Sequence, residues 1–109
     1  MKKGRKASAH DLYVQRNYGL EPGEYDAMYE AQGGLCYTCR RANGKTRKLS
    51  VDHDHACCPK PPTCGQCNRG LLCRPCNDMF GLARDDIQFF VRAIQYLSSP
   101  PAKQSRADG

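Results

Sequence analysis

The sequence predicts a small α+β domain that is fastened by zinc and contains a short β-hairpin with helices before and after it. Three observations predict this fold class. The chain has 109 residues, which is room for a single domain. Val, Ile, Leu and Phe together number only 16 against 8 cysteines, so we expect a thin hydrophobic core to which bound metal adds folding energy. Segments of alternating polarity lie between segments of helical periodicity.

Charge and hydropathy exclude several classes of protein. The chain carries 17 Lys and Arg against 11 Asp and Glu, a formal net charge of +6. No apolar run approaches the ~18 residues that span a bilayer, which excludes an integral membrane protein. Residues 1–8 are basic and lack the apolar stretch of a signal peptide, so we expect no secretion and a reducing cytoplasm. Such a compartment disfavours disulfides, which leaves the cysteines available for metal.

The chain is expected to consist of a basic flexible tail over residues 1–10, one domain over residues 11–99 and a C-terminal tail over residues 100–109. The first expected helix covers residues 12–18 and ends at Gly19. The second has Pro22 in its first turn, acidic residues near its start, and Gly33 and Gly34 as its stop.

The second half of the chain begins with two expected strands. Polar and apolar residues alternate over 48–53, which predicts one strand, and the short apolar segment 70–72 predicts another. A helix is expected to start near Cys73. The last helix takes Asp85 as its N-cap, carries an apolar stripe between Ile87 and Leu97, and ends before Pro100.

The cysteines form three Cys-x-x-Cys pairs. They are Cys36/Cys39, Cys64/Cys67 and Cys73/Cys76. This spacing lets two thiolates reach one tetrahedral ion, and two such pairs indicate a structural zinc site. The alternative for one pair is a thioredoxin-like redox site, but that requires a βαβ context that the sequence does not show. Spacing alone leaves open which pairs share an ion.

A second group of cysteines lies in a proline-rich segment over residues 56–69. Its members are Cys57, Cys58, Cys64 and Cys67. These four thiolates could close a second zinc site. Adjacent cysteines share an ion less comfortably than spaced ones, so His55 is an alternative ligand in place of Cys57 or Cys58. The competing interpretation is a set of reduced thiols without metal.

The densest cluster of ligand-type side chains is Asp52-His53-Asp54-His55. On a regular strand, the two carboxylates would point to one face and the two imidazoles to the other, so Asp52 and His53 converge only if the strand end is distorted. Together with Asn77, which follows a Cys-x-x-Cys pair, Asp52 offers oxygen ligands suited to a hard cation such as Mg²⁺. A neutral His53 could take a proton from water. We expect Asp54 to cap a turn.

Three segments carry a resemblance to a known family. They are Gln32–Cys36, Val51–His55 and Arg69–Asn77, in which Cys-x-x-Cys, Asp-His-Asp-His and Cys-x-x-Cys-Asn follow in order. The chain resembles the recombination endonuclease VII family of HNH (ββα-metal, His-Me finger) nucleases over roughly residues 24–97. It departs from the family pattern in the insert over residues 56–67, which adds four cysteines.

The resemblance implies a zinc-stapled ββα-metal core and assigns roles to its residues. The structural zinc would be bound by Cys36, Cys39, Cys73 and Cys76. Asp52 and Asn77 would hold the catalytic Mg²⁺ or Mn²⁺. In the implied one-metal mechanism, His53 is the general base that deprotonates a water, and His55 supports the site near the scissile phosphate.

Basic side chains surround this candidate centre in the sequence. Those of the polar turn are Arg40, Arg41, Lys45, Arg47 and Lys48. They form either a solvated face or, beside a nuclease centre, contacts to DNA phosphates. Arg69, Arg74 or Lys48 could steady the scissile phosphate, and the sequence leaves open which of them does. His10 is assigned no role.

Two functions compete at this point. The leading hypothesis is a metal-dependent DNA endonuclease, a phosphodiester hydrolase of phage or bacterial origin acting in the cytoplasm of a bacterial host. Its expected partners are DNA and phage or host DNA-processing proteins, without a membrane, and a monomer is favoured while the oligomeric state stays open. The alternative is a non-catalytic zinc-ribbon DNA-binding or adaptor module, which explains the cysteines and the charge but does not require Asp52, His53 and Asn77.

Overall fold

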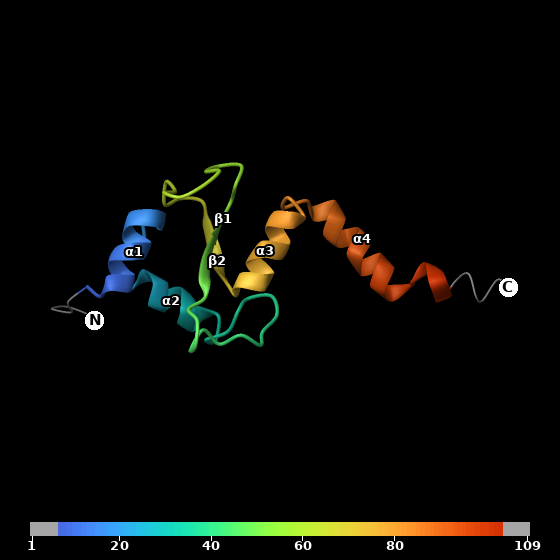
Figure 1. Cartoon of the computed structure of the whole chain (residues 1–109), viewed down its shortest axis with the longest axis horizontal. Helices are drawn as coiled ribbons and strands as arrows, with labels where there is room; N and C mark the ends of the chain where they lie inside the picture. The colour runs from blue at the N-terminus through green and yellow to red at the C-terminus, as the bar shows by residue number, and fades with distance from the viewer. Residues whose placement is uncertain (1–6, 104–109) are drawn as a thin grey trace. The chain divides into compact units, whose positions relative to one another are not determined.

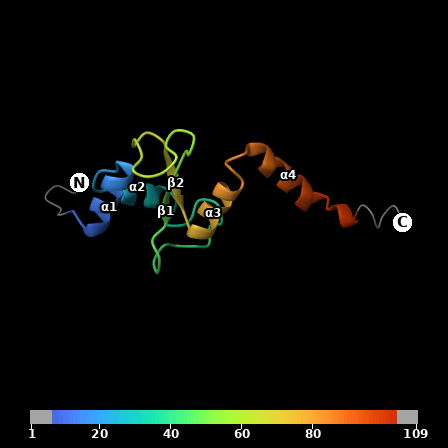
Figure 2. The ribbon, with the colours of Figure 1, turned by 45° about the horizontal axis from the view of Figure 1, so that its top comes forward.

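The computed structural model describes residues 7–103, and its elements confirm a small α+β architecture with a hairpin and helices before and after it. Of the predicted tails over residues 1–10 and 100–109, residues 1–6 and 104–109 lie outside the described residues. The elements are α1 (Ala9–Tyr18), α2 (Glu24–Ala31), β1 (Ser50–His53), β2 (Asn68–Leu72), α3 (Arg74–Leu82) and α4 (Ile87–Ser98). Figures 1 and 2 show α1 and α2 together on one side of the hairpin.

Helix α1 begins earlier than the periodicity predicts because a capping box fixes its start. The Ser8 hydroxyl accepts the Asp11 amide proton at 3.0 Å, and the Asp11 carboxylate accepts the Ser8 amide proton at 2.9 Å. Residues 9 and 10 are therefore helical, although they were expected in the tail. Gly19 ends the helix as predicted, in the left-handed conformation (φ 66°) that glycine adopts at low cost.

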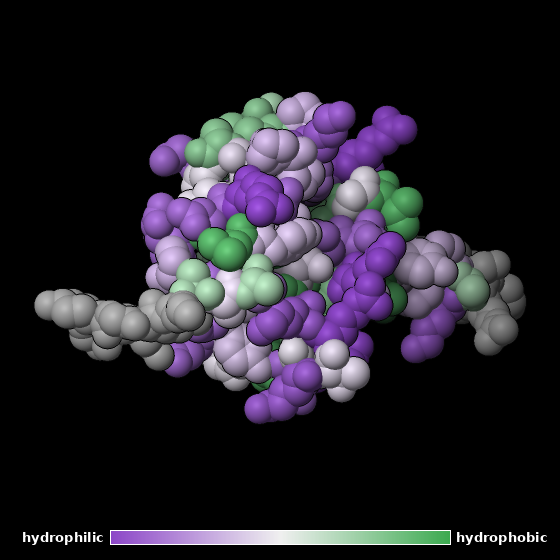
Figure 3. Space-filling view, turned by 60° about the vertical axis from the view of Figure 1, so that its left-hand side comes forward, coloured by the Kyte–Doolittle hydropathy of each residue, from purple (hydrophilic) through white to green (hydrophobic). Residues whose placement is uncertain are grey.

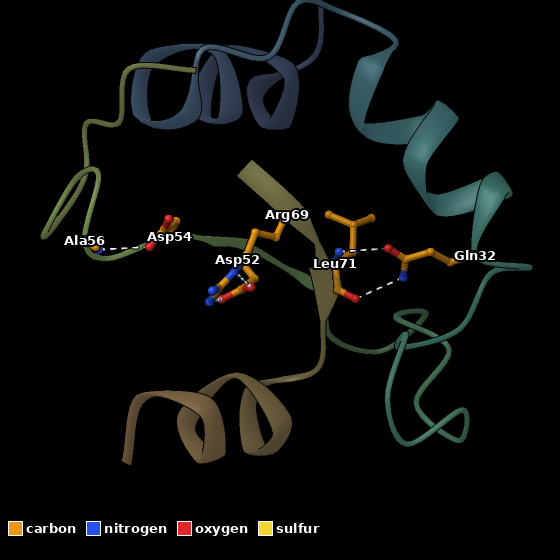
Figure 4. A network of polar contacts seen from close by, with 6 residues as sticks. All are labelled: Gln32, Asp52, Asp54, Ala56, Arg69 and Leu71. Carbon is orange, nitrogen blue, oxygen red and sulfur yellow. Dashed lines mark hydrogen bonds and ion pairs between the residues drawn. The ribbon is translucent and has the colours of Figure 1, made fainter. Parts of the chain in front are cut away.

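Helix α2 starts at Glu24, two residues after the proline that was predicted in its first turn, with Gly23 as its N-cap. The phenol of Tyr25, a buried residue of this helix, donates a hydrogen bond to the backbone carbonyl of Leu49, just before β1. At the end of α2, the Gln32 side-chain oxygen accepts the Leu71 amide proton, and its amide nitrogen donates to the Leu71 carbonyl (Figure 4). Both ends of α2 are thereby attached to the hairpin.

The hairpin is antiparallel and contains one irregularity. Ser50 pairs with Leu72, and Asp52 with Gly70, but His53 pairs with Asn68, so one residue of β2 is skipped. The skipped residue is Arg69, which makes this a β-bulge, the kind of feature that re-aims side chains at strand ends. This irregularity lies opposite the end of β1, where a distortion would let Asp52 and His53 converge.

The chain divides into two compact units, residues 1–77 and 78–109, and the second is described by itself. Within it, α4 takes Asp86 rather than the predicted Asp85 as its N-cap, and the Asp86 carboxylate accepts the Gln88 amide proton at 2.9 Å. Asp85 has a left-handed backbone (φ 54°), which does not suit an N-cap. No helix among the described residues is long and apolar enough to cross a membrane.

Candidate active site and metal centres

The structure brings together two cysteines that follow α2 and two that lie at the start of α3. This core cluster consists of Cys36, Cys39, Cys73 and Cys76, whose sulfurs all lie within 4.8 Å of one another. The Cys39 and Cys73 sulfurs are 3.9 Å apart. Four sulfurs at ~2.3 Å from a tetrahedral zinc are separated by roughly 3.8 Å, so the spacing fits that ion. Of the three Cys-x-x-Cys pairs, the first and the third are therefore the two whose sulfurs converge in this cluster.

Backbone amides supply part of the positive potential in the core cluster. Burial raises the pKa of the Cys36 thiol, but the amide protons of Cys39 and Cys73, together with the hydrogen bonds from Thr38, outweigh it and lower that pKa to about 5. Burial raises the pKa of Cys73 to about 12, with the neighbouring thiols adding to the effect and the Cys76 amide opposing it. Such a mixture suits a site where a bound metal displaces the remaining thiol protons.

The second group of cysteines also converges. This loop cluster consists of Cys57, Cys58, Cys64 and Cys67, whose sulfurs lie within 4.8 Å of one another. The Cys57 and Cys64 sulfurs are 3.7 Å apart, again close to the tetrahedral zinc spacing. His55, the alternative ligand, is not a member of the group. All eight cysteines are free thiols in this structure, so both clusters could hold zinc.

Amide protons and neighbouring thiols divide the loop cluster in the same way. The Gln66 amide proton, followed by the thiols of Cys57 and Cys58, lowers the pKa of Cys64 to about 7. The thiol of Cys64, followed by those of Cys67 and Cys58, raises the pKa of Cys57 to about 12. These shifts favour the thiolate form of Cys64 and the thiol form of Cys57.

Asp52 is buried and forms an ion pair across the bulge. The Nε proton of Arg69 is donated to Asp52 Oδ2 at 2.7 Å and an Nη2 proton to Oδ1 at 3.2 Å. Figure 4 shows the two side chains pointing toward one another from the two strands. A buried carboxylate requires such a partner, and the planar guanidinium matches both of its oxygens. Sequence reasoning missed this pair, in which the partner of Asp52 is the residue that the strand register skips.

His53 is buried next to Asp52 at the end of β1, with both residues 6% exposed. Its Nε2 atom is buried and has no hydrogen-bond partner within the described residues. Leaving such an atom unpaired costs roughly 1–3 kcal/mol, so this nitrogen fits a site that receives a hydrogen bond from a bound molecule. The His53 ring lies 4.5 Å from the His55 ring and 6.1 Å from that of Tyr18.

The two remaining members of the predicted centre have different surroundings. Asp54 caps a turn, as predicted, because its Oδ1 accepts the Ala56 amide proton at 3.0 Å (Figure 4). Asn77 lies in the first turn of α3, where its amide proton is donated to the Cys73 carbonyl at 2.9 Å. In the described part of the chain, no hydrogen bond joins the Asn77 side chain to Asp52 or His53.

Several of the predicted DNA-contacting residues gather at one cavity. Arg47, Lys48 and Arg74 line a hollow of about 450 Å³ that also borders Cys73 of the core cluster. The others are dispersed: Arg40 lies over the ring of Tyr37, while Arg69 is engaged with Asp52. Arg41 and Lys45 are exposed on the same polar turn. On the face seen in Figure 3, hydrophilic side chains predominate, and hydrophobic ones are scattered among them.

Comparison with known proteins identifies the family. A sequence model of the recombination endonuclease VII family matches residues 11–99. The "Gene 59 protein" of Mycobacterium phage L5 is 48% identical over 101 residues, which cover 92% of this chain and 57% of that protein. The "Gene 59 protein" of Mycobacterium phage D29 is 46% identical over 104 residues, which cover 94% and 58%. This chain thus spans little more than half of either relative, and no solved structure matches it significantly. Since the family match extends over most of its length, the chain belongs to the recombination endonuclease VII family.

Proposed function

We propose that this protein is a metal-dependent DNA endonuclease that hydrolyses phosphodiester bonds in the cytoplasm of a phage-infected cell. Residues 11–99 form one nuclease domain, in which β1, β2 and α3 make an HNH-type ββα-metal core. The observation that carries the proposal is His53, whose buried Nε2 has no hydrogen-bond partner among residues 7–103 and lies at a bulge beside the buried carboxylate of Asp52. A buried imidazole with one available nitrogen, next to an acid, suits proton transfer.

His53 is the general base in this proposal. Its Nε2 accepts a proton from the water that attacks the phosphorus atom, and the burial of the ring keeps this nitrogen in one position. His55, 4.5 Å away between ring centres, supports the ring of His53 and faces the scissile phosphate. Neither His53 nor His55 is a member of a cysteine cluster, so the proposed catalytic residues differ from the proposed zinc ligands.

Asp52 and Asn77 would hold a catalytic Mg²⁺ or Mn²⁺. One carboxylate and one amide oxygen are hard ligands of the kind these cations prefer, with water and substrate phosphate completing the shell. When bound, such a cation offsets the negative charge that develops on the leaving oxygen. Arg69 uses one lone pair on each oxygen of Asp52, so a cation would take a remaining lone pair or displace one of the two hydrogen bonds.

DNA would be held by the basic residues at the cavity beside the core cluster. Arg47, Lys48 and Arg74 line this hollow and provide three positive charges for backbone phosphates. This arrangement supports Lys48 and Arg74 as candidates for binding the scissile phosphate. Arg69, the third candidate, already forms an ion pair with Asp52. Contacts of this kind position the duplex without selecting a sequence.

Plasmid nicking in Mg²⁺ or Mn²⁺ tests the proposal. The His53→Ala variant should lose ~10²–10⁴-fold in nicking rate, because that is the usual contribution of a positioned base. His10→Ala is the matched control, since it removes a histidine on α1 that has no place in the proposed centre. Zinc content and circular dichroism of both variants should equal those of the parent.

Two outcomes would contradict the proposal. Equal nicking by the parent and His53→Ala would remove His53 as the base. A pure, zinc-loaded parent that binds DNA but nicks it with neither cation would favour a non-catalytic zinc-ribbon binding module. Either result leaves the zinc clusters unaffected, because their ligands are separate residues.

A further inference from the structure

The loop over residues 56–66 has no apolar core of its own. None of its residues is buried, and three of them are prolines. Ordering each residue of a loop costs roughly 1–2 kcal/mol of backbone entropy, which exposed side chains do not repay. The features that gather this loop are therefore its hydrogen bonds and the convergence of the four sulfurs of the loop cluster.

On one side, this loop is attached to the end of α1. The Thr63 amide proton is donated to the Asn17 carbonyl at 2.8 Å. The Asn68 side chain, one residue after Cys67, donates to the Tyr18 carbonyl at 2.7 Å. Gly19 and Gly65 approach so closely that a Cβ on Gly19 would lie 3.1 Å from the Gly65 Cα.

On the other side, the cysteines of the loop hold the turn that carries the histidines. The Asp54 amide proton is donated to the Cys67 carbonyl at 2.9 Å, and the Asp54 carbonyl accepts the amide protons of Cys57 and Cys58, both at 3.1 Å. Three of the four cysteines of the loop cluster thus form backbone hydrogen bonds with Asp54, the residue between His53 and His55. Tyr18, on the α1 side, has its ring 6.1 Å from that of His53.

We propose that the loop cluster binds a second Zn²⁺, and that this ion acts as a clamp holding the His53–His55 turn against the end of α1. The metal takes the place of the thiol protons of Cys57, Cys58, Cys64 and Cys67, and the released protons go to solvent. Its ligands are joined to Asp54 on one side and, through Thr63, to α1 on the other. The proposal that the loop cluster binds zinc does not depend on the proposed function. The proposal that the ion positions catalytic histidines does rest on it.

The test compares the parent with the double variant Cys57→Ser/Cys64→Ser, which removes the two exposed ligands. Native mass spectrometry should find two zinc ions in the parent and one in the variant. The imidazole NMR signals of His53 and His55 should broaden or shift, and the amides of residues 17–20 should exchange faster with deuterium. The matched control, Lys60→Ala/Gln66→Ala, changes exposed side chains of the same loop and should keep both ions and the parent's signals.

Each result decides the matter. A parent with one zinc ion, or with Cys57 and Cys64 oxidised to a disulfide, overturns the second site. Loss of one ion with unchanged histidine signals and exchange overturns the clamp. If the variant fails to fold, cadmium NMR of the parent decides, since two tetrathiolate signals support the site and one refutes it. None of these measurements requires catalysis, so an inactive parent with two zinc ions would refute only the proposed function.

Discussion

The core cluster and the loop cluster each contain four cysteines, but they occupy different places in the chain. In the core cluster, Cys39 and Cys73 are 34 residues apart, and Cys36 is completely buried. In the loop cluster, Cys57 and Cys64 are 7 residues apart, and both are exposed. The difference in closed-loop length alone changes the entropy of closure by only about 1.4 kcal/mol. What separates the clusters is therefore the structure attached to each.

The core cluster lies where the main elements meet. Cys36 follows α2, and Cys73 lies between β2 and α3, so an ion there joins the helix, the hairpin and the start of α3. The loop cluster lies wholly within the connection between the two strands. The comparison shows that the same set of four thiols can act over two ranges. A zinc ion in the core cluster would join the main elements of the fold, and one in the loop cluster would hold a single turn, as proposed above.

The largest effect is expected at the core cluster. Cys36→Ser should abolish cooperative folding, because structural zinc contributes ~10–16 kcal/mol in zinc-finger peptides, about as much as the ~5–15 kcal/mol total stability of a domain. Thermal melts followed by circular dichroism, together with the zinc content, measure this. A cooperative transition close to that of the parent would show that the core cluster does not fasten the fold.

A smaller effect is expected where α2 joins β2 without metal. Gln32→Ala removes two hydrogen bonds to Leu71 and one to the Leu35 carbonyl, and should cost about 1–3 kcal/mol of unfolding free energy. Denaturant unfolding measures it, with an unchanged zinc content. The control Gln15→Ala loses only an exposed bond to Glu21 and should change stability by less than ~0.5 kcal/mol. Equal costs would mean that the hydrogen bonds of Gln32 do not stabilise the attachment of α2 to β2.

Loss of the loop cluster should matter still less for global stability. Cys57→Ser/Cys64→Ser should lower the unfolding free energy by roughly 1 kcal/mol, since the loop has no buried residue before Cys67. Cooperative unfolding by denaturant should persist. A collapse as complete as that of Cys36→Ser would remove the distinction between a staple and a clamp.

The smallest expected effect is on how the unfolding free energy changes with pH, and it does not involve the cysteine clusters. Burial, followed by the charge of Lys48, lowers the pKa of His10 below its ordinary value, against weaker opposing effects of Asp11 and Asp26. The folded state therefore binds this proton less readily than the unfolded chain does. Its contribution to stability is fully present above pH ~6.5 and is lost as pH falls from there through the folded pKa.

His10→Gln measures this contribution separately from acid loss of zinc. The variant should show a shallower fall in unfolding free energy than the parent between about pH 7 and 5.5, with equal zinc content in both. Identical slopes would show that His10, whose ring packs edge-on against Tyr25 at 4.5 Å, does not contribute to the acid sensitivity.

The sequence by itself determined the local features. Cys-x-x-Cys spacing, the glycine after α1, the turn at Asp54 and the strand before it are all governed by neighbours a few residues away, so they can be predicted from the chain alone. The start of α1 could also have been found, because Ser8 and Asp11 have capping-box spacing. The family resemblance was confirmed by the match over residues 11–99.

Only the tertiary structure decided how distant segments combine. It brought the sulfurs of the first and third Cys-x-x-Cys pairs together, as the family resemblance had implied and spacing alone had not. It also left the four sulfurs of the loop to one another and placed the ring of His55 beside that of His53. It also placed a bulge at Arg69, whose side chain forms an ion pair with Asp52. No local sequence pattern predicts this bulge or this pair. These outcomes depend on which groups are buried together, because burial decides where a charge needs a partner and where an imidazole nitrogen is left without one.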